Sequence, residues 1–325
     1  MTRYRVPILS TLVIVIAILA AACSPSGSLG SVPPVDPTPG PSLGSTPPDA
    51  TPAPSPTVPP ASAPPSGAPS ATPEPSTTEK MIVRGYFILA GELGTEGLVP
   101  YLFEVPKTQA VARAAMEKLL AGSAVQRDGY AAISTAIPAG TRLLGLSISG
   151  GIATVDLSGE FEAGGGSRST LARLGQVVYT LTQFSTVDAV AFEVDGEPVT
   201  VFGSEGLVIH GPMVRAAFED VLPAIFVDRP AFGAALASLS HVTGTSNNFE
   251  ATFRISILDG DGRVLSDQMA MATSGSGTRG TFDVVVEYDL PGRAEWGTLR
   301  VYEPSAQDGS PIHVRDYPVW LTPAG

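Results

Sequence analysis

From residue 81 onward, the hydrophobic positions follow the two periods that distinguish strands from helices. Between Met81 and Val105 they alternate with polar positions in two runs separated by a glycine-rich turn, which predicts two strands. Between Thr108 and Gly122 they recur every three or four residues. This spacing predicts a helix that Thr108 caps and Gly122 terminates.

The same reasoning carries the prediction on to about residue 201. Leu143–Ile148 and Ile152–Leu157 are two runs joined by a glycine turn, as in a β-hairpin. A second helix is predicted from Ser167 or Ser169, and a last strand with its own Asp195-Gly196 turn follows. Strands and helices are therefore mixed and hairpins join the strands. We expect an α+β domain with two helices on a mixed or antiparallel sheet, rather than a doubly wound parallel sheet.

The last hundred residues contain no long helical pattern. Seven short apolar runs are separated by turn signals every 8–12 residues, which predicts an all-β immunoglobulin-like sandwich. The runs are 225–227, 240–244, 251–258, 264–272, 282–288, 299–302 and 314–321.

The N-terminus has the pattern of an export signal. Arg3 and Arg5 precede an apolar run from Val6 to Leu19, which is shorter than the roughly 18–20 residues of a membrane span. Small residues then lead to Cys23, the only cysteine in the chain, and the segment resembles the bacterial lipobox. It departs from that pattern in having Ala20 where Leu is usual. The resemblance implies that Cys23 is lipidated and that the protein is held on the outer face of the cell membrane; an ordinary signal-peptidase site is the alternative.

A segment rich in proline follows the cysteine. Eighteen of the 31 prolines lie between Pro25 and Pro75, and no aromatic residue, Ile, Lys or Arg occurs from Ser24 to Glu79. Such a composition buries too little apolar surface to offset the entropy of ordering, so we expect a disordered tether.

Three motifs in the α+β region resemble one known family. They are Ile133–Leu144 (ISTAIPAGTRLL), Gly151–Phe161 (GIATVDLSGEF) and Gly165–Ser167 (GGS). Together with the preceding strands and helix, they resemble the GerMN domain of bacterial sporulation and spore-germination lipoproteins.

The C-terminal region carries a second resemblance. Val242–Ala251 (VTGTSNNFEA), Gly280–Phe282 and Ser305–Ser310 (SAQDGS) resemble the immunoglobulin-like domain found after GerMN in spore-germination proteins. The two resemblances occur in the expected order. They imply a role in assembly, peptidoglycan association or germination.

These observations predict five segments. They are a signal peptide (1–22), a disordered linker (23–79), a GerMN-like α+β domain (80–205), a connector (206–223) and an immunoglobulin-like sandwich (224–325).

Candidate chemistry is sparse. His210, His241 and His313 lack metal-ligand spacing, and no nucleophile motif or phosphate-binding glycine pattern occurs. Residues 259–262 (DGDG) lack the later ligands of a calcium loop, so we interpret them as a hairpin turn. We therefore expect no cofactor and no metal. The net charge of −12 argues against nucleic acid and anionic headgroups as partners.

One weak binding site is suggested. Ser167 and Arg168 follow three glycines at the start of a predicted helix, where exposed N–H groups and the helix dipole favour an anion. Asp156 ends a strand of the matched motif. A flexible helix entry and an aspartate that accepts bonds from nearby loop amides are the alternatives.

The sequence favours a non-catalytic lipoprotein of the cell envelope, with both domains acting as interaction modules. Peptidoglycan and envelope proteins are the expected partners, together with the membrane that receives the lipid. A cell-wall enzyme with an unrecognised site and a solute-capturing receptor are the alternatives.

Overall fold

The structure is a computed structural model of the 325-residue chain. It describes residues 79–91, 96–122, 133–289 and 292–323. The predicted signal peptide, Cys23 and the linker up to residue 78 lie outside the described residues.

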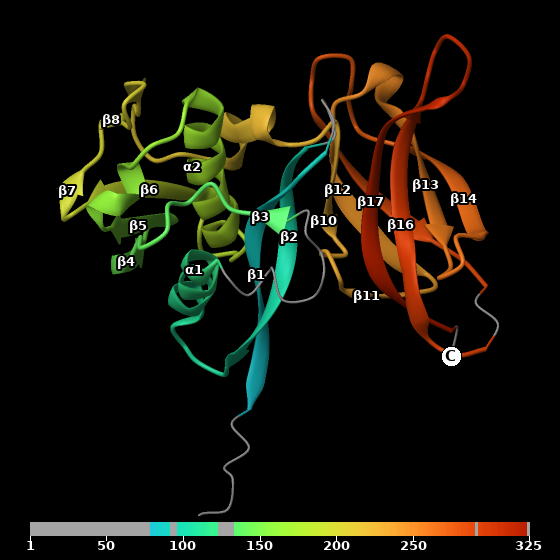
Figure 1. Cartoon of the computed structure of the whole chain (residues 1–325), viewed down its shortest axis with the longest axis horizontal. Coiled ribbons are helices and arrows are strands. Elements are labelled where there is room, and N and C mark those ends of the chain that lie inside the picture. Colours follow the sequence, from blue (N-terminus) through green and yellow to red (C-terminus); the bar gives the residue numbers. More distant parts are fainter. Residues whose placement is uncertain (1–78, 92–95, 123–132, 290–291, 324–325) are drawn as a thin grey trace, which may run out of the picture. The chain divides into compact units, whose positions relative to one another are not determined.

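The two strands predicted at the start of the α+β region pair with each other (Figure 1). They are antiparallel over their whole length, with Lys80 opposite Pro106 and Leu89 opposite Gly97. A two-residue strand joins the other edge of β1, which gives a three-stranded sheet with the order β2-β1-β3. The bounds are β1 (Lys80–Leu89), β2 (Gly97–Pro106) and β3 (Ile133–Ser134).

The predicted hairpin lies in a second sheet, with the order β4-β5-β6-β7. β4 and β5 are antiparallel around Gly150 and Gly151, which both have positive φ. β5 and β6 are parallel, because helix α2 lies between them in the chain and carries it back to the starting edge. The bounds are β4 (Leu143–Ser149), β5 (Ile152–Leu157), β6 (Ala189–Val194) and β7 (Glu197–Pro198).

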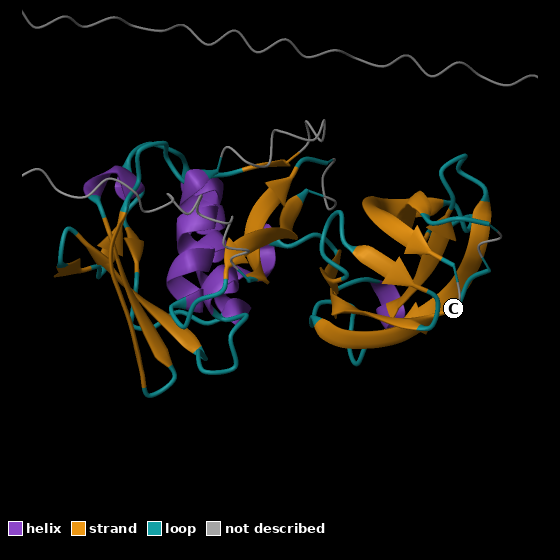
Figure 2. Cartoon of the chain, turned by 90° about the horizontal axis from the view of Figure 1, so that it is seen from below, coloured by secondary structure: helices purple, strands orange, loops and turns teal. Residues whose placement is uncertain are grey.

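The two helices lie between these sheets, and this differs from the single sheet predicted from the sequence. Figure 2 shows the longer helix with strands on both sides. Every residue of α2 from Ala172 to Leu181 is buried, whereas a helix covered on one face would bury only every third or fourth residue. The bounds are α1 (Val111–Ala121) and α2 (Ser167–Leu181).

Polar side chains on and just after α2 bind the edge of β1 that β2 leaves open. Gln183 receives the Arg84 N–H at 3.0 Å and donates to the Arg84 carbonyl at 2.6 Å. Thr180 Oγ1 accepts the Tyr86 N–H at 3.1 Å, and Gln176 Nε2 donates to the Tyr86 carbonyl at 2.8 Å. Side chains therefore replace a neighbouring strand here, because a buried backbone edge needs hydrogen-bond partners.

The ends of α1 correct one prediction and confirm another. The helix begins at Val111, and Thr108 does not cap it: its hydroxyl accepts the N–H of Ala110 at 3.1 Å in the preceding turn. Gly122 terminates α1 with a φ of 53°, and its N–H bonds to the Leu119 carbonyl. The smaller elements of this region are η2 (Gly159–Glu162), β8 (Val201–Phe202), β9 (Leu207–Val208) and η3 (Arg215–Val221).

The C-terminal region forms two sheets. Their orders are β10-β12-β15 and β11-β17-β16-β13-β14, and inward residues such as Phe253, Phe282 and Val301 are buried between them. All seven predicted strands are present. The bounds are β10 (Ile225–Arg229), β11 (Ala235–Ala237), β12 (Ser240–Ser246), η4 (Phe249–Ala251), β13 (Thr252–Leu258), β14 (Val264–Met271), β15 (Gly280–Val286), β16 (Glu295–Pro304) and β17 (Pro311–Thr322).

The sequence did not reveal β11, which pairs parallel to the end of β17. The turn predicted at residues 259–262 is confirmed. Asp259 Oδ1 accepts the N–H groups of Asp261 and Arg263 at 3.1 and 2.8 Å, so this carboxylate holds the β13–β14 turn together.

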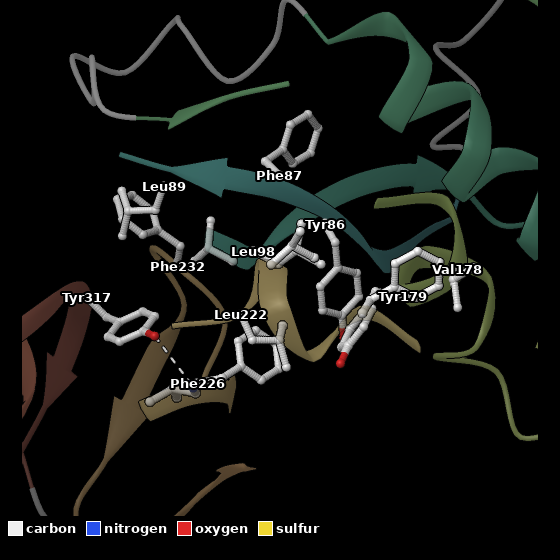
Figure 3. Close-up of a cluster of buried hydrophobic side chains, with 14 of the residues drawn as sticks. Tyr86, Phe87, Leu89, Leu98, Val178, Tyr179, Leu222, Phe226, Phe232 and Tyr317 are labelled. Carbon is white, nitrogen blue, oxygen red and sulfur yellow. Dashed lines mark hydrogen bonds between the residues drawn. The ribbon is translucent and has the colours of Figure 1, made fainter. Parts of the chain in front are cut away.

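The two domains share a buried cluster (Figure 3). The ring of Phe226 lies 5.7 Å from Tyr179 and 6.5 Å from Tyr86 of the first domain. Within the sandwich, Tyr317 Oη accepts the Val227 N–H at 3.3 Å. Phe232 N–H also bonds to the Pro100 carbonyl at 2.8 Å. The helices within the described ranges are all too short or too polar to span a bilayer.

Candidate functional site

A cleft of about 730 Å³ lies where the two domains meet. One wall comes from α2 and η3 of the first region, and the other from strands β10, β12 and β15 with the end of β14 and the β14–β15 loop. The cleft is comparable in volume to pockets that hold small molecules or short segments of chain. Its lining is Tyr179, Arg215, Ala216, Glu219, Phe226, Asp228, Thr243, Gly244, Thr245, Met271, Thr273, Arg279, Thr281, Phe282 and Asp283.

Asp228, near the end of β10, lines the cleft and contacts three side chains of the first domain. Its carboxylate accepts a hydrogen bond from the Tyr86 phenol and pairs with Arg84 Nη1 at 3.2 Å. Arg215 Nη1 lies 3.9 Å away. Burial, and then the charge of Asp228, raise the pKa of Tyr86 far above its ordinary value of 10.0, so this phenol stays a hydrogen-bond donor.

Arg215 fixes the start of η3 against α2. Its Nε donates to Thr182 Oγ1 at 2.7 Å, and its Nη2 donates to the Tyr179 carbonyl at 3.2 Å. The guanidinium carbon lies 4.5 Å from the centre of the Tyr179 ring, within the range of a cation–π contact. The donors of Arg215 are therefore largely used within the protein.

Four threonines lie on the sandwich side of the cleft. Thr243 lies opposite Asp283 in the β12–β15 register, and Thr245 lies opposite Thr281. Thr273 Oγ1 accepts the N–H of Thr281 at 2.9 Å. Within the described residues, the Thr243 hydroxyl has no hydrogen-bond partner. This wall offers hydroxyl groups that can donate and accept.

Arg279, in the loop before β15, has an unusual set of partners. It donates to the Pro223 carbonyl at 2.9 Å, and to the carbonyl and hydroxyl of Thr245 at 3.4 and 3.3 Å. Its Nε is buried without a partner. In the ranges that the structure describes, no carboxylate lies within 4.0 Å of this guanidinium. Burial lowers the pKa of Arg279 below its ordinary value.

The remaining acids of the cleft have different surroundings. Asp283 Oδ1 lies 2.5 Å from His241 Nδ1, at the exposed rim. Glu219, on η3, is exposed and forms no ion pair in the described part of the chain. Among its described residues the lining contains no Ser, Cys, His or Lys, and none of its threonine hydroxyls is hydrogen-bonded to a carboxylate. Charged and hydroxyl groups in this arrangement are suited to binding.

The three residues predicted as a weak site have separate partners elsewhere. Asp156 Oδ1 accepts the Gly196 N–H at 3.0 Å, which matches the alternative of an aspartate bonding a loop amide. Ser167 Oγ donates to Glu205 Oε2 at 3.3 Å, and Arg168 pairs with Glu96 at 2.8 Å. Arg168 and Glu96 line a smaller cavity of about 320 Å³ at the start of α2. A binding role for the three stays a prediction.

The glycine-rich segment before α2 is held by a buried arginine that the sequence reasoning missed. Arg173 is 2% exposed and donates to four carbonyls. Its acceptors are Ala136, Phe161, Ala163 and Gly164, at distances from 2.5 to 3.1 Å. An arginine inside a helical apolar pattern next to a loop rich in glycine was the only available signal.

The histidines stay apart from one another. His313 Nδ1 contacts Glu303 at 3.0 Å, and His241 contacts Asp283. Across the described ranges, no cluster of three or more His, Cys, Asp or Glu side chains could hold a metal ion.

The fold and the cleft define a two-domain protein, in which an α+β domain is followed by an immunoglobulin-like sandwich. Two family models match parts of the chain. A model described as sporulation and spore germination matches residues 86–200, and one described as the immunoglobulin-like domain of bacterial spore germination matches residues 224–310. The chain therefore contains a domain of the first family followed by a domain of the second.

Solved structures of a sporulation protein also match. The first GerMN domain of GerM from Bacillus subtilis is 23% identical with a TM-score of 0.36, and the match covers 42% of this chain and 98% of that one. The tandem GerMN domains of the same protein are 16% identical with a TM-score of 0.37, covering 64% of this chain and 62% of that one. No curated protein matches the chain.

Proposed function

We propose that this protein is a non-catalytic binding module of the cell envelope with a sporulation-related role. Lipid attached to Cys23 anchors it to the outer face of the cell membrane. The proline-rich linker carries the two domains away from that surface, and the domains bind peptidoglycan or another envelope component. The alternative of a cell-wall enzyme has no observation in its favour.

The observation that carries the binding role is the cleft between the domains. Its walls are charged and hydroxyl-bearing, and no threonine hydroxyl of the described lining is hydrogen-bonded to a carboxylate. Backbone and side-chain contacts join the two domains, including Phe232 to Pro100 and Asp228 to Tyr86. Neither domain alone would form this cleft, so binding in it requires both domains.

The test uses the full-length protein with purified peptidoglycan and, in parallel, cross-linking in living cells. We expect co-sedimentation with the wall, or cross-linking to envelope proteins, without release of soluble wall fragments. Release of fragments would make the protein an enzyme. The anchor is tested separately: Cys23→Ser should move the protein from the membrane fraction to the soluble fraction, and unchanged membrane retention would disprove lipid anchoring.

A further inference from the structure

The charges that line the cleft are unequally compensated. Arg215 lies beside Asp228 and contacts two tyrosines, and Asp283 lies beside His241. Arg279, by contrast, has only neutral oxygens as partners. Taking a guanidinium partly out of water without a counter-ion is costly, because the lost hydration is not replaced by an opposite charge. The lowered pKa of Arg279 reflects this same burial.

The contacts of Arg279 leave room for a better acceptor. Its two bonds to Thr245, at 3.3 and 3.4 Å, are long for N–H···O bonds, which are most often about 2.9–3.0 Å. A carboxylate binds a guanidinium through charge-assisted bonds that are shorter and about twice as strong as neutral ones. None of the carboxylates of the described residues therefore occupies the position beside Arg279.

We propose that the cleft binds a peptide segment through a carboxylate that pairs with Arg279. This inference rests on the proposed binding role. The hydroxyl groups of the four threonines form hydrogen bonds with the peptide groups next to that carboxylate. Thr243 has a hydroxyl without a partner in the described chain, and Met271, 65% exposed, offers apolar contact.

The lining favours a peptide over a sugar chain. Sugar rings generally bind by stacking on open aromatic faces, and the aromatic residues here are covered: Tyr179 is 4% exposed and Phe226 is 1% exposed. A peptide carboxylate can come from the peptides of the cell wall or from an envelope protein, and the two sources share this chemistry.

Glu219 allows the sign of the ligand's charge to be tested. It lies on the opposite wall and its charge acts on Arg279, but it is too far away to form an ion pair. A bound carboxylate is repelled by Glu219 and attracted by Arg279. The two substitutions Arg279→Gln and Glu219→Gln should therefore change binding in opposite directions.

The experiment measures co-sedimentation of full-length protein with purified peptidoglycan, either untreated or with its carboxylates converted to amides. Amidation of the wall or Arg279→Gln should weaken binding at least about tenfold, as expected for loss of a charged hydrogen bond. Glu219→Gln should strengthen binding about twofold. Thr243→Val, which keeps the shape of the side chain, should weaken it about fivefold even if Arg279→Gln impairs folding. Arg113→Gln, a surface change on α1, is the matched control and should have no effect.

Whether an envelope protein supplies the carboxylate is tested by cross-linking in living cells. A photoreactive amino acid at position 243 should capture an envelope protein only when Arg279 is intact. Binding that is equal for native and amidated wall, with capture independent of Arg279, overturns the carboxylate ligand and leaves the proposed binding role standing. Failure of the wild-type protein to bind either the wall or an envelope protein overturns both.

Discussion

The phenol of Tyr86 donates a hydrogen bond to the carboxylate of Asp228, and this bond joins strand β1 of the GerMN domain to strand β10 of the immunoglobulin-like domain. Tyr86 is fully buried and Asp228 is one-fifth exposed at its side chain. Around them, Arg84 and Arg215 supply positive charge. A buried bond to a charged acceptor contributes more than an exposed one, so this pair should couple the two domains.

We predict that Tyr86→Phe lowers the free energy of unfolding by about 1.5–3 kcal/mol, the contribution of a hydrogen bond to a charged group. Phenylalanine keeps the ring contacts with Tyr179 and Phe226, so packing changes little. Calorimetry should also show the single transition broadening or separating into two. Tyr302→Phe is the control: its Oη lies 3.5 Å from Asp267 in an exposed site, and its removal should cost less than about 0.5 kcal/mol. Equal effects of the two changes would contradict a special role for Tyr86.

We predict that Arg173→Met destabilises the GerMN domain by about 3 kcal/mol, because it leaves several carbonyl groups with fewer donors in a buried place. Urea denaturation measures the loss. Hydrogen exchange should be faster in residues 161–167, where Arg173 holds the chain. Arg113→Met removes only an exposed contact of 3.9 Å and should change stability by less than about 0.5 kcal/mol. Unchanged exchange in that segment would show that Arg173 does not order it.

The elements of the fold were predictable from the sequence because their signals are local. The β4–β5 hairpin needs alternation around Gly150 and Gly151, and the end of α1 needs Gly122; each signal lies within a few residues. The division into two sheets was not predictable. It depends on Gln176 and Gln183 bonding to β1 about ninety residues earlier, and polar residues on a helix ordinarily indicate a solvent-facing side.

The residues of the cleft were even harder to predict from the sequence than the division into two sheets. Arg215, Asp228 and Arg279 lie in the connector, the first strand of the sandwich and a late loop, and each is unremarkable among its neighbours in the sequence. Only tertiary packing brings them to one place. The sequence instead pointed to Ser167 and Arg168, whose glycine-rich surroundings resemble a local anion site.

We predict that Gly97→Ala destabilises the protein by about 3 kcal/mol, well above the cost of an ordinary glycine substitution. Gly97 has a φ of 147°, and an added Cβ would lie 2.6 Å from the Val221 carbonyl oxygen in η3. Backbone strain and overpacking therefore add. Gly150→Ala is the matched control, with a φ of 57° and open space around it, and should cost about 1 kcal/mol. Urea denaturation compares the two, and similar losses would show that η3 can move away from β2.

The last prediction concerns acid. Hydrogen bonds from Arg254, helped by Ser256, lower the pKa of Asp267 below its ordinary value of 3.8, although partial burial opposes this. A carboxyl whose pKa is lowered by folding stabilises the protein above its unfolded pKa, and that stabilisation is lost as the pH falls through the folded pKa. Asp267→Asn should therefore lower the melting temperature at pH 7, and the difference from the wild type should shrink as the pH falls below about 4. Asp220→Asn, an exposed change without an ion pair in the described chain, should show no such convergence. A difference for Asp267→Asn that stays constant down to about pH 2 would show that the charge of Asp267 does not stabilise the sandwich.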